Sequence, residues 1–85
     1  MKRVHIPTDQ AIVLQHINEL GEDDFVGLAQ ALRMGRARLA NIIQILHHKR
    51  LIVVQRSAAD IWVRLSAKGR AAMRHIWPEA ARWQH

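Results

Sequence analysis

Apolar residues recur at helical spacing in the first half of the chain. Val13, Ile17 and Leu20 follow one another every three or four residues after Pro7 and Thr8. This spacing predicts a helix over about 8–20, with Thr8 as its N-cap. The first element is therefore expected to be an amphipathic helix.

The segment GEDD, residues 21–24, separates this helix from a second one. Gly21 suits the left-handed residue that ends a helix, and Asp24 suits the N-cap of the next. One face of a short second helix, expected over about 25–33, carries the apolar residues Phe25, Leu28, Ala29 and Leu32. The next connection is only MGR, residues 34–36, and two helices joined so tightly pack at a steep angle, as in a helix-turn-helix.

A third helix is predicted from about Arg36 to Lys49. At about 100° per residue, one arc of this helix is apolar and carries Leu39, Ile42, Ile43 and Leu46. The opposite face is small and polar and carries Ala37, Ala40, Asn41, Gln44 and His48. Arg36 and Arg38 border that face, so it is expected to stay in solvent with cations on both sides.

After Arg50 the apolar period changes from helical to alternating. The β-branched runs LIVVQR and IWVRL are joined by SAAD, which predicts a hairpin over residues 51–65. Alternation places Leu51, Val53, Ile61, Val63 and Leu65 inward. The residues expected outward are Arg56, Trp62 and Arg64.

Ser66 is a suitable N-cap for a last helix, expected over 67–83. Pro78 disfavours helix at Trp77, so an interruption is expected there. An apolar stripe along its second half, at Ile76, Trp77, Ala80 and Trp83, would close the core or meet a second subunit. A second subunit meeting this stripe would form a homodimer, which is the expected assembly.

Three segments resemble the MarR-type transcriptional regulators. LAQAL at 28–32 is similar to the second-helix signature of that family, and ILHHKRLIVV at 45–54 to its recognition helix entering the wing. RLSAKGRAAM at 64–73 is similar to its strand-to-helix junction, Leu-Ser/Thr-x-Lys-Gly. The resemblance covers about 24–74. It implies an α+β, mostly α, winged helix-turn-helix fold with three helices, a two-stranded wing hairpin and a C-terminal helix.

The sequence departs from this family at several points. Arg50 stands where the family usually has glycine, the residue that best accommodates a left-handed C-cap. The wing is shorter, and Asp60 is followed by Ile61 and Trp62 instead of the family's Asp-x-Arg-Arg cluster. The long dimerisation helices of the family are missing or truncated in these 85 residues.

Composition limits the alternatives. With 85 residues the chain is expected to be one domain, 1–85. The absence of cysteine excludes disulfides, zinc ribbons and thiol nucleophiles, and no apolar run reaches membrane or signal-peptide length, so a cytoplasmic location is expected. No two histidines have the i, i+4 spacing of a helical metal site and no glycine-rich phosphate loop is present, so neither an enzyme nor a metal or cofactor site is expected.

Charge is distributed unevenly along the chain. Residues 1–24 hold two Lys or Arg against five carboxylates, whereas the remainder holds eleven against two. Concentrated cationic charge is typical of nucleic-acid binding.

The third helix is therefore interpreted as a recognition helix for double-stranded DNA, in a transcriptional regulator that acts as a repressor. The residues expected to contact DNA are Arg36, Ala37, Arg38, Ala40, Asn41, Gln44, His48, Arg56 and Arg64. A winged-helix protein-interaction module without specific DNA binding is the alternative, and it requires Ile45, Trp62, Trp77 and Trp83 to form one patch. RNA binding is a weaker third, because the chain has few aromatic residues for stacking. A small-molecule effector site at a dimer interface would have little volume in so short a chain.

Overall fold

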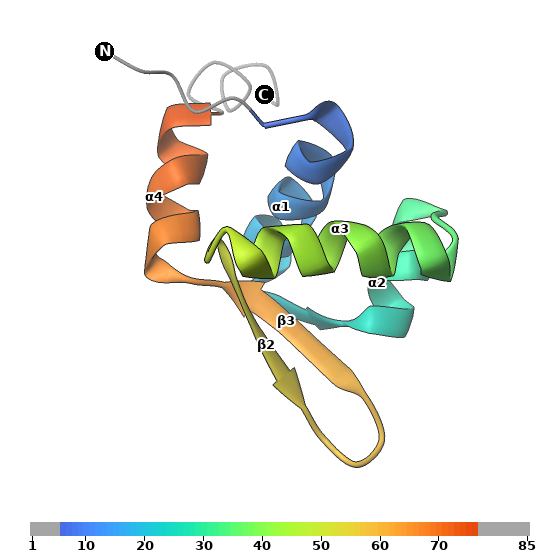
Figure 1. The fold of residues 1–85 in the computed structure, drawn as a ribbon. Coiled ribbons are helices and arrows are strands. Elements are labelled where there is room, and N and C mark those ends of the chain that lie inside the picture. Colours follow the sequence, from blue (N-terminus) through green and yellow to red (C-terminus); the bar gives the residue numbers. More distant parts are fainter. Residues whose placement is uncertain (1–5, 77–85) are drawn as a thin grey trace.

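A computed structural model describes residues 6–76, without the side chains of residues 75 and 76 (Figure 1). The elements follow the expected order of three helices, a hairpin and a helix. Their bounds are α1 Thr8–Leu20, β1 Glu22–Asp24, α2 Phe25–Leu32, α3 Arg36–His48, β2 Ile52–Arg56, β3 Ile61–Leu65 and α4 Ala67–Ile76. The part of the last helix expected beyond residue 76 lies outside the described residues.

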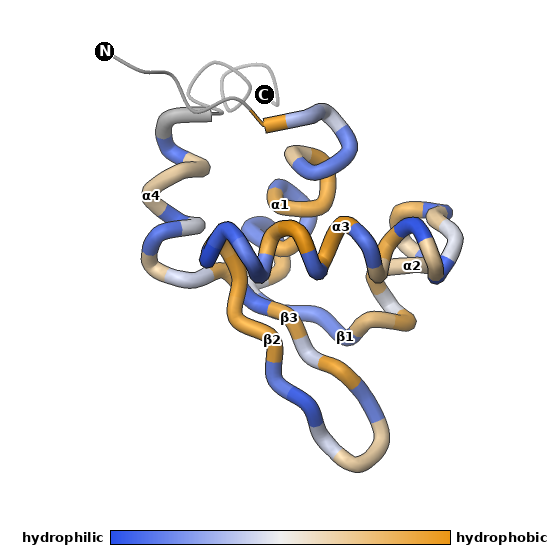
Figure 2. The backbone as a smooth tube through the Cα atoms, in the orientation of Figure 1, coloured by the Kyte–Doolittle hydropathy of each residue, from blue (hydrophilic) through white to orange (hydrophobic). Residues whose placement is uncertain are grey.

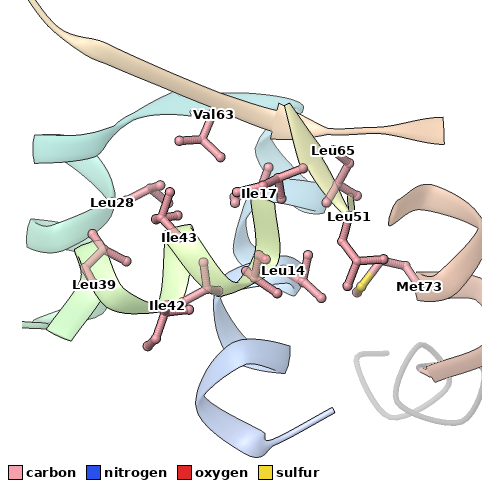
Figure 3. Packing of buried hydrophobic residues seen from close by; sticks show 13 residues of the cluster. Leu14, Ile17, Leu28, Leu39, Ile42, Ile43, Leu51, Val63, Leu65 and Met73 are labelled. Atoms are coloured by element: carbon pink, nitrogen blue, oxygen red, sulfur yellow. The ribbon is translucent and has the colours of Figure 1, made fainter. Parts of the chain in front are cut away.

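The helices enclose an apolar core that also covers one face of the sheet (Figure 3). The apolar arc expected on α3 is confirmed, since Leu39, Ile42, Ile43 and Leu46 are all buried. The same cluster includes Leu14 and Ile17 of α1, Leu28 of α2, Val63 of β3 and Met73 of α4. Along α3 the residues alternate between hydrophobic and hydrophilic bands (Figure 2), as a helix with one face in the core and one in solvent requires.

The sheet has three antiparallel strands in the order β1-β3-β2, and the hairpin of β2 and β3 extends away from the helices (Figure 1). The expected two-stranded hairpin is therefore incomplete. The sequence predicts only a connection between two helices at GEDD, but Glu22, Asp23 and Asp24 pair with Arg64, Val63 and Trp62. Acidic residues have low strand propensity, so this strand forms because β3 supplies a partner edge.

Two of the predicted N-caps are confirmed and one is wrong. The Asp24 carboxylate accepts the Gly27 amide at 3.3 Å, and Ser66 Oγ accepts the Gly69 amide at 2.9 Å. At the start of α1, however, Pro7 occupies the N-cap position and Thr8 is the first helical residue. The fixed φ of proline suits entry into a helix, and no side-chain cap is made there.

The inward set expected on the first wing strand is confirmed for Leu51, which is buried, but is wrong for Val53. Val53 pairs with Arg64, whereas Ile52 pairs with Leu65 and Val54 with Val63, so the even-numbered residues face the core. The cause is Arg50, which adopts a left-handed φ of 63° despite not being glycine. That turn buries Leu51 before the strand begins and shifts the strand's alternation by one residue.

Candidate nucleic-acid interface

The outward face of α3 is open to solvent in the described part of the chain. A three-residue turn, 33–35, joins α2 to α3, and Arg33 adopts a left-handed φ of 51° there. Because four core residues fix the inner arc of α3, the opposite arc points away from the molecule. All the helix residues expected to contact DNA are exposed: Arg36, Ala37, Arg38, Ala40, Asn41, Gln44 and His48.

A groove of about 540 Å³ runs between α3 and the wing. Ala37, Ala40, Asn41 and Gln44 line its helical side, and Arg56 lines its wing side. Five of the predicted residues therefore meet in one concave surface. Arg56 reaches it because it pairs with Ile61 and shares the face of β2 that is turned toward α3.

The cations around the groove are available to a ligand. Within residues 6–76 the one basic nitrogen within 4.0 Å of a carboxylate oxygen is His16 Nε2 on α1, which lies 3.8 Å from Asp23 Oδ2 on β1. Arg36, Arg38 and Arg56 are exposed and pair with no carboxylate of that range. Their charge is thus not neutralised locally, which favours an anionic partner.

Arg64 and His48 lie apart from the groove. Arg64 lies opposite Glu22 and Val53 in the ladder, on the face of β3 turned away from α3. His48 lines a shallow depression at the end of α3 together with Lys49, whose Nζ donates to Gln10 Oε1 at 3.0 Å. The subunit-contact candidates Trp77, Ala80 and Trp83, and the side chain of Ile76, lie outside the described residues.

Sequence reasoning missed His47 and the apolar floor of the groove. His47 lines the groove beside Gln44, and the floor consists of Phe25, Ile43, Val54 and Ile61. The spacing of Ala40, Gln44 and His47, four residues and then three, could have placed His47 on this face. The floor could not be found in this way because it is assembled from four separate elements.

One carboxylate at the base of the wing is perturbed. A hydrogen bond with the Asp60 side chain lowers the pKa of Asp24 below its ordinary value, and the Gly27 amide adds to this effect. Together these hydrogen bonds outweigh desolvation, which acts in the opposite direction and raises the pKa. The N-cap of α2 is therefore held in its charged form.

Among residues 6–76, no three His, Asp or Glu side chains lie close enough together to hold a metal ion. No helix of that same range is long and apolar enough to cross a membrane.

Comparison with known proteins gave structural neighbours only. No family model matches the chain, and no curated protein matches its sequence. BpsR of Bordetella bronchiseptica, whose DNA binding is regulated by 6-hydroxynicotinic acid, superimposes with a TM-score of 0.81 at 23% identity over 93% of this chain. A mutant of MarR from E. coli complexed with operator DNA gives 0.78 at 18% identity, also over 93%.

A third neighbour has a more similar sequence. This protein from Pseudomonas aeruginosa PA01, proposed to be a transcriptional regulator, is 31% identical over 89% of the chain, with a TM-score of 0.76. The chain spans 58%, 61% and 54% of the lengths of BpsR, MarR and the P. aeruginosa protein, respectively. The likeness therefore extends over nearly all of this chain but over little more than half of each neighbour.

Proposed function

We propose that the chain binds double-stranded DNA sequence-specifically and is a transcriptional regulator that acts as a repressor. The proposal starts from its winged helix-turn-helix fold, which is the fold of the MarR regulators. The observation that carries the proposal is the outward face of α3, which is exposed, lined by small and amide side chains, and shares a groove with Arg56. In the proposed complex α3 enters the major groove, which is wide enough for one helix.

In the proposed complex the short and amide side chains of this face contact the base edges. Asn41 and Gln44 can each make two hydrogen bonds to adenine, and Ala37 and Ala40 permit close approach and contact with a thymine methyl group. Arg36 and Arg38 reach guanine or phosphate from the borders of the face.

Phosphate contacts come from the wing and from the end of α3. Arg56 reaches the backbone from the groove, and His48 from the last turn of the helix. Arg64 would reach a phosphate only from the far face of the wing. These contacts set position and affinity and carry no base preference.

The structural neighbours support this assignment. MarR is complexed with operator DNA, and DNA binding by BpsR is regulated by a small aromatic acid. By analogy we propose a homodimer whose two α3 helices lie about 34 Å apart in successive major grooves. Ile76, Trp77, Ala80 and Trp83 are its proposed contacts, and a small-molecule effector would bind at that interface. The proposed location is the cytoplasm, and no catalytic role is proposed.

Within residues 6–76, Ile45 and Trp62 do not form the apolar patch that the alternative of a protein-docking module needs. The other two members of that expected patch, Trp77 and Trp83, lie outside the described residues. Ile45 lies on α3, half-buried, whereas Trp62 lies on the face of β3 turned away from α3 and is 40% exposed.

Selection from a random duplex library tests the proposal. The 85-residue chain should enrich a defined sequence, and that duplex should bind about 10³-fold or more tightly than random duplex at equal salt. Enrichment of no sequence, with equal weak binding to every duplex, would contradict sequence-specific recognition.

A further inference from the structure

Three consecutive backbone carbonyl groups directly after α3 accept hydrogen bonds from the start of α4. Lys68 Nζ donates to the Lys49 carbonyl at 3.1 Å, Ser66 Oγ to the Arg50 carbonyl at 2.7 Å, and the Ser66 amide to the Leu51 carbonyl at 3.1 Å. The C-cap of α3, Lys49, is the first of the three residues. The start of α4 therefore holds the C-cap and the two residues that lead from α3 into β2.

Gly69 allows this close approach. A Cβ at residue 69 would lie 2.0 Å from the Leu51 carbonyl oxygen, so only glycine lets the first turn of α4 reach this backbone. The segment Ser66 to Gly69 thus contacts one point of the fold, the junction between α3 and β2. We call Ser66, Lys68 and Gly69, with the three carbonyls they contact, the junction clamp.

The same end of α3 is also held from α1. Lys49 Nζ donates to Gln10 Oε1, and Gln10 is the one buried polar side chain of the described residues. The last turn of α3 is therefore fixed by α1 on one side and by α4 on the other. Its first turn has no side-chain cap.

We infer that Lys68 is a positioning residue for DNA recognition, acting through the Lys49 carbonyl to hold α3 at the angle at which Asn41 and Gln44 meet base edges. The inference rests on the proposed function. Base-edge hydrogen bonds need heavy-atom distances near 3 Å, so a small tilt of α3 breaks them while flexible phosphate contacts survive. The Lys68 ammonium also lies at the negative end of the α3 dipole, which strengthens its hydrogen bond.

Three variants of the full chain separate positioning from simple charge. Lys68→Met removes the donor and the charge, Lys68→Gln removes the charge but keeps a donor, and Arg74→Met removes an equal charge from an exposed site on the same helix. Each is titrated with the duplex enriched by the wild-type chain and with random duplex, over a range of salt concentrations.

Positioning predicts that Lys68→Met weakens binding of the enriched duplex by about five-fold, with random duplex and the salt slope unchanged. Lys68→Gln should retain most of the affinity, and Arg74→Met should leave the ratio between the two duplexes unchanged. A phosphate contact by Lys68 would give a different pattern. Lys68→Met would then lose affinity equally for both duplexes, the slope of affinity against salt would fall by about one, and Lys68→Gln would bind as weakly as Lys68→Met. A Met variant equal to wild type on both duplexes would also overturn the inference.

Amide hydrogen exchange tests the clamp without DNA. The amides of Lys49, Arg50 and Leu51 donate to carbonyls of the last turns of α3, at 3.0 Å each. They should exchange faster in Lys68→Met than in Lys68→Gln or wild type, and unchanged exchange would contradict the clamp. If the wild-type chain enriched no duplex, the proposed function would fail while this measurement still decided whether Lys68 holds α3.

Discussion

Among single residues, Asn41 and Gln44 are the ones that we propose to recognise bases. Replacing either with alanine should weaken binding of the enriched duplex by about 1–3 kcal/mol and leave binding of random duplex nearly unchanged. The reason is that an amide that pairs with adenine discriminates between bases. Competition titrations with single-base variants of the duplex measure this.

Arg56→Ala is the matched control for these two variants. Arg56 shares the groove but is proposed to contact phosphate, so its loss should weaken binding of all duplexes alike. Equal losses on enriched and random duplex for Asn41→Ala would show that Asn41 reads no base.

Gly69 gives a second prediction for a single residue. In most helices Gly→Ala is stabilising, but here the new Cβ would meet the Leu51 carbonyl oxygen at 2.0 Å. We expect Gly69→Ala to lower the free energy of unfolding by about 2–4 kcal/mol, measured by urea denaturation. Gly35→Ala is the control, since nothing lies within 4 Å of its Cβ, and it should cost less than about 1 kcal/mol. Equal effects of the two substitutions would contradict the close contact at Gly69.

Helix and strand boundaries differ in how far sequence could reveal them. The helices follow from apolar spacing and capping residues, both of which are local signals. Strand β1 could not be predicted, because EDD has no strand pattern and forms a strand only by pairing with β3. The face of Arg56 was missed for a related reason, since the left-handed Arg50 shifts the strand by one residue and arginine gives no sign of that conformation.

The left-handed backbone of Arg50, just after α3, is strained for a residue that has a side chain, and this strain can be tested. Arg50→Gly should raise the free energy of unfolding by about 0.5–1 kcal/mol and the melting temperature by a few degrees. Glycine adopts a positive φ without the steric clash that a Cβ causes there. Ala71→Gly, at an exposed position inside α4, should instead cost about 1 kcal/mol. Destabilisation by Arg50→Gly, seen in thermal unfolding, would mean that the Arg50 side chain outweighs the strain.

The Asp24 N-cap at the start of α2 should make the free energy of unfolding depend on pH. The pKa of Asp24 lies below its ordinary 3.8 in the folded chain, chiefly through Asp60, so folding favours the charged form. The part of this stability that comes from the Gly27 amide is present above pH 3.8 and is lost as the pH falls through the lower, folded pKa. The hydrogen bond with Asp60 needs a proton shared between the two carboxyl groups and adds nothing when both are ionised. Urea unfolding between about pH 5 and pH 2.5 should show this loss, and Asp24→Asn, which keeps a capping side chain, should reduce it. An identical pH profile for the variant would assign the acid sensitivity elsewhere.

For the molecule as a whole, the number of cations at the proposed interface determines how strongly salt weakens DNA binding. Four cations at or beside the proposed interface, Arg36, Arg38, Lys49 and Arg56, would neutralise about four phosphates per subunit. The logarithm of the binding constant should then fall with the logarithm of salt concentration with a slope of about −3 to −4 per subunit. Fluorescence anisotropy with random duplex measures the slope, and a value near zero would exclude an electrostatic interface.

The pairing of β1 with β3 also has a kinetic consequence. It joins residues about forty positions apart and fastens the base of the wing to the segment that leads into α2. Contacts so distant along the chain close slowly, so the helix-turn-helix should reach its final packing only when the hairpin is in place. The wing would then open only together with the helices, and an open conformation with a loose hairpin on an intact helical body should be too rare to serve as a regulatory state.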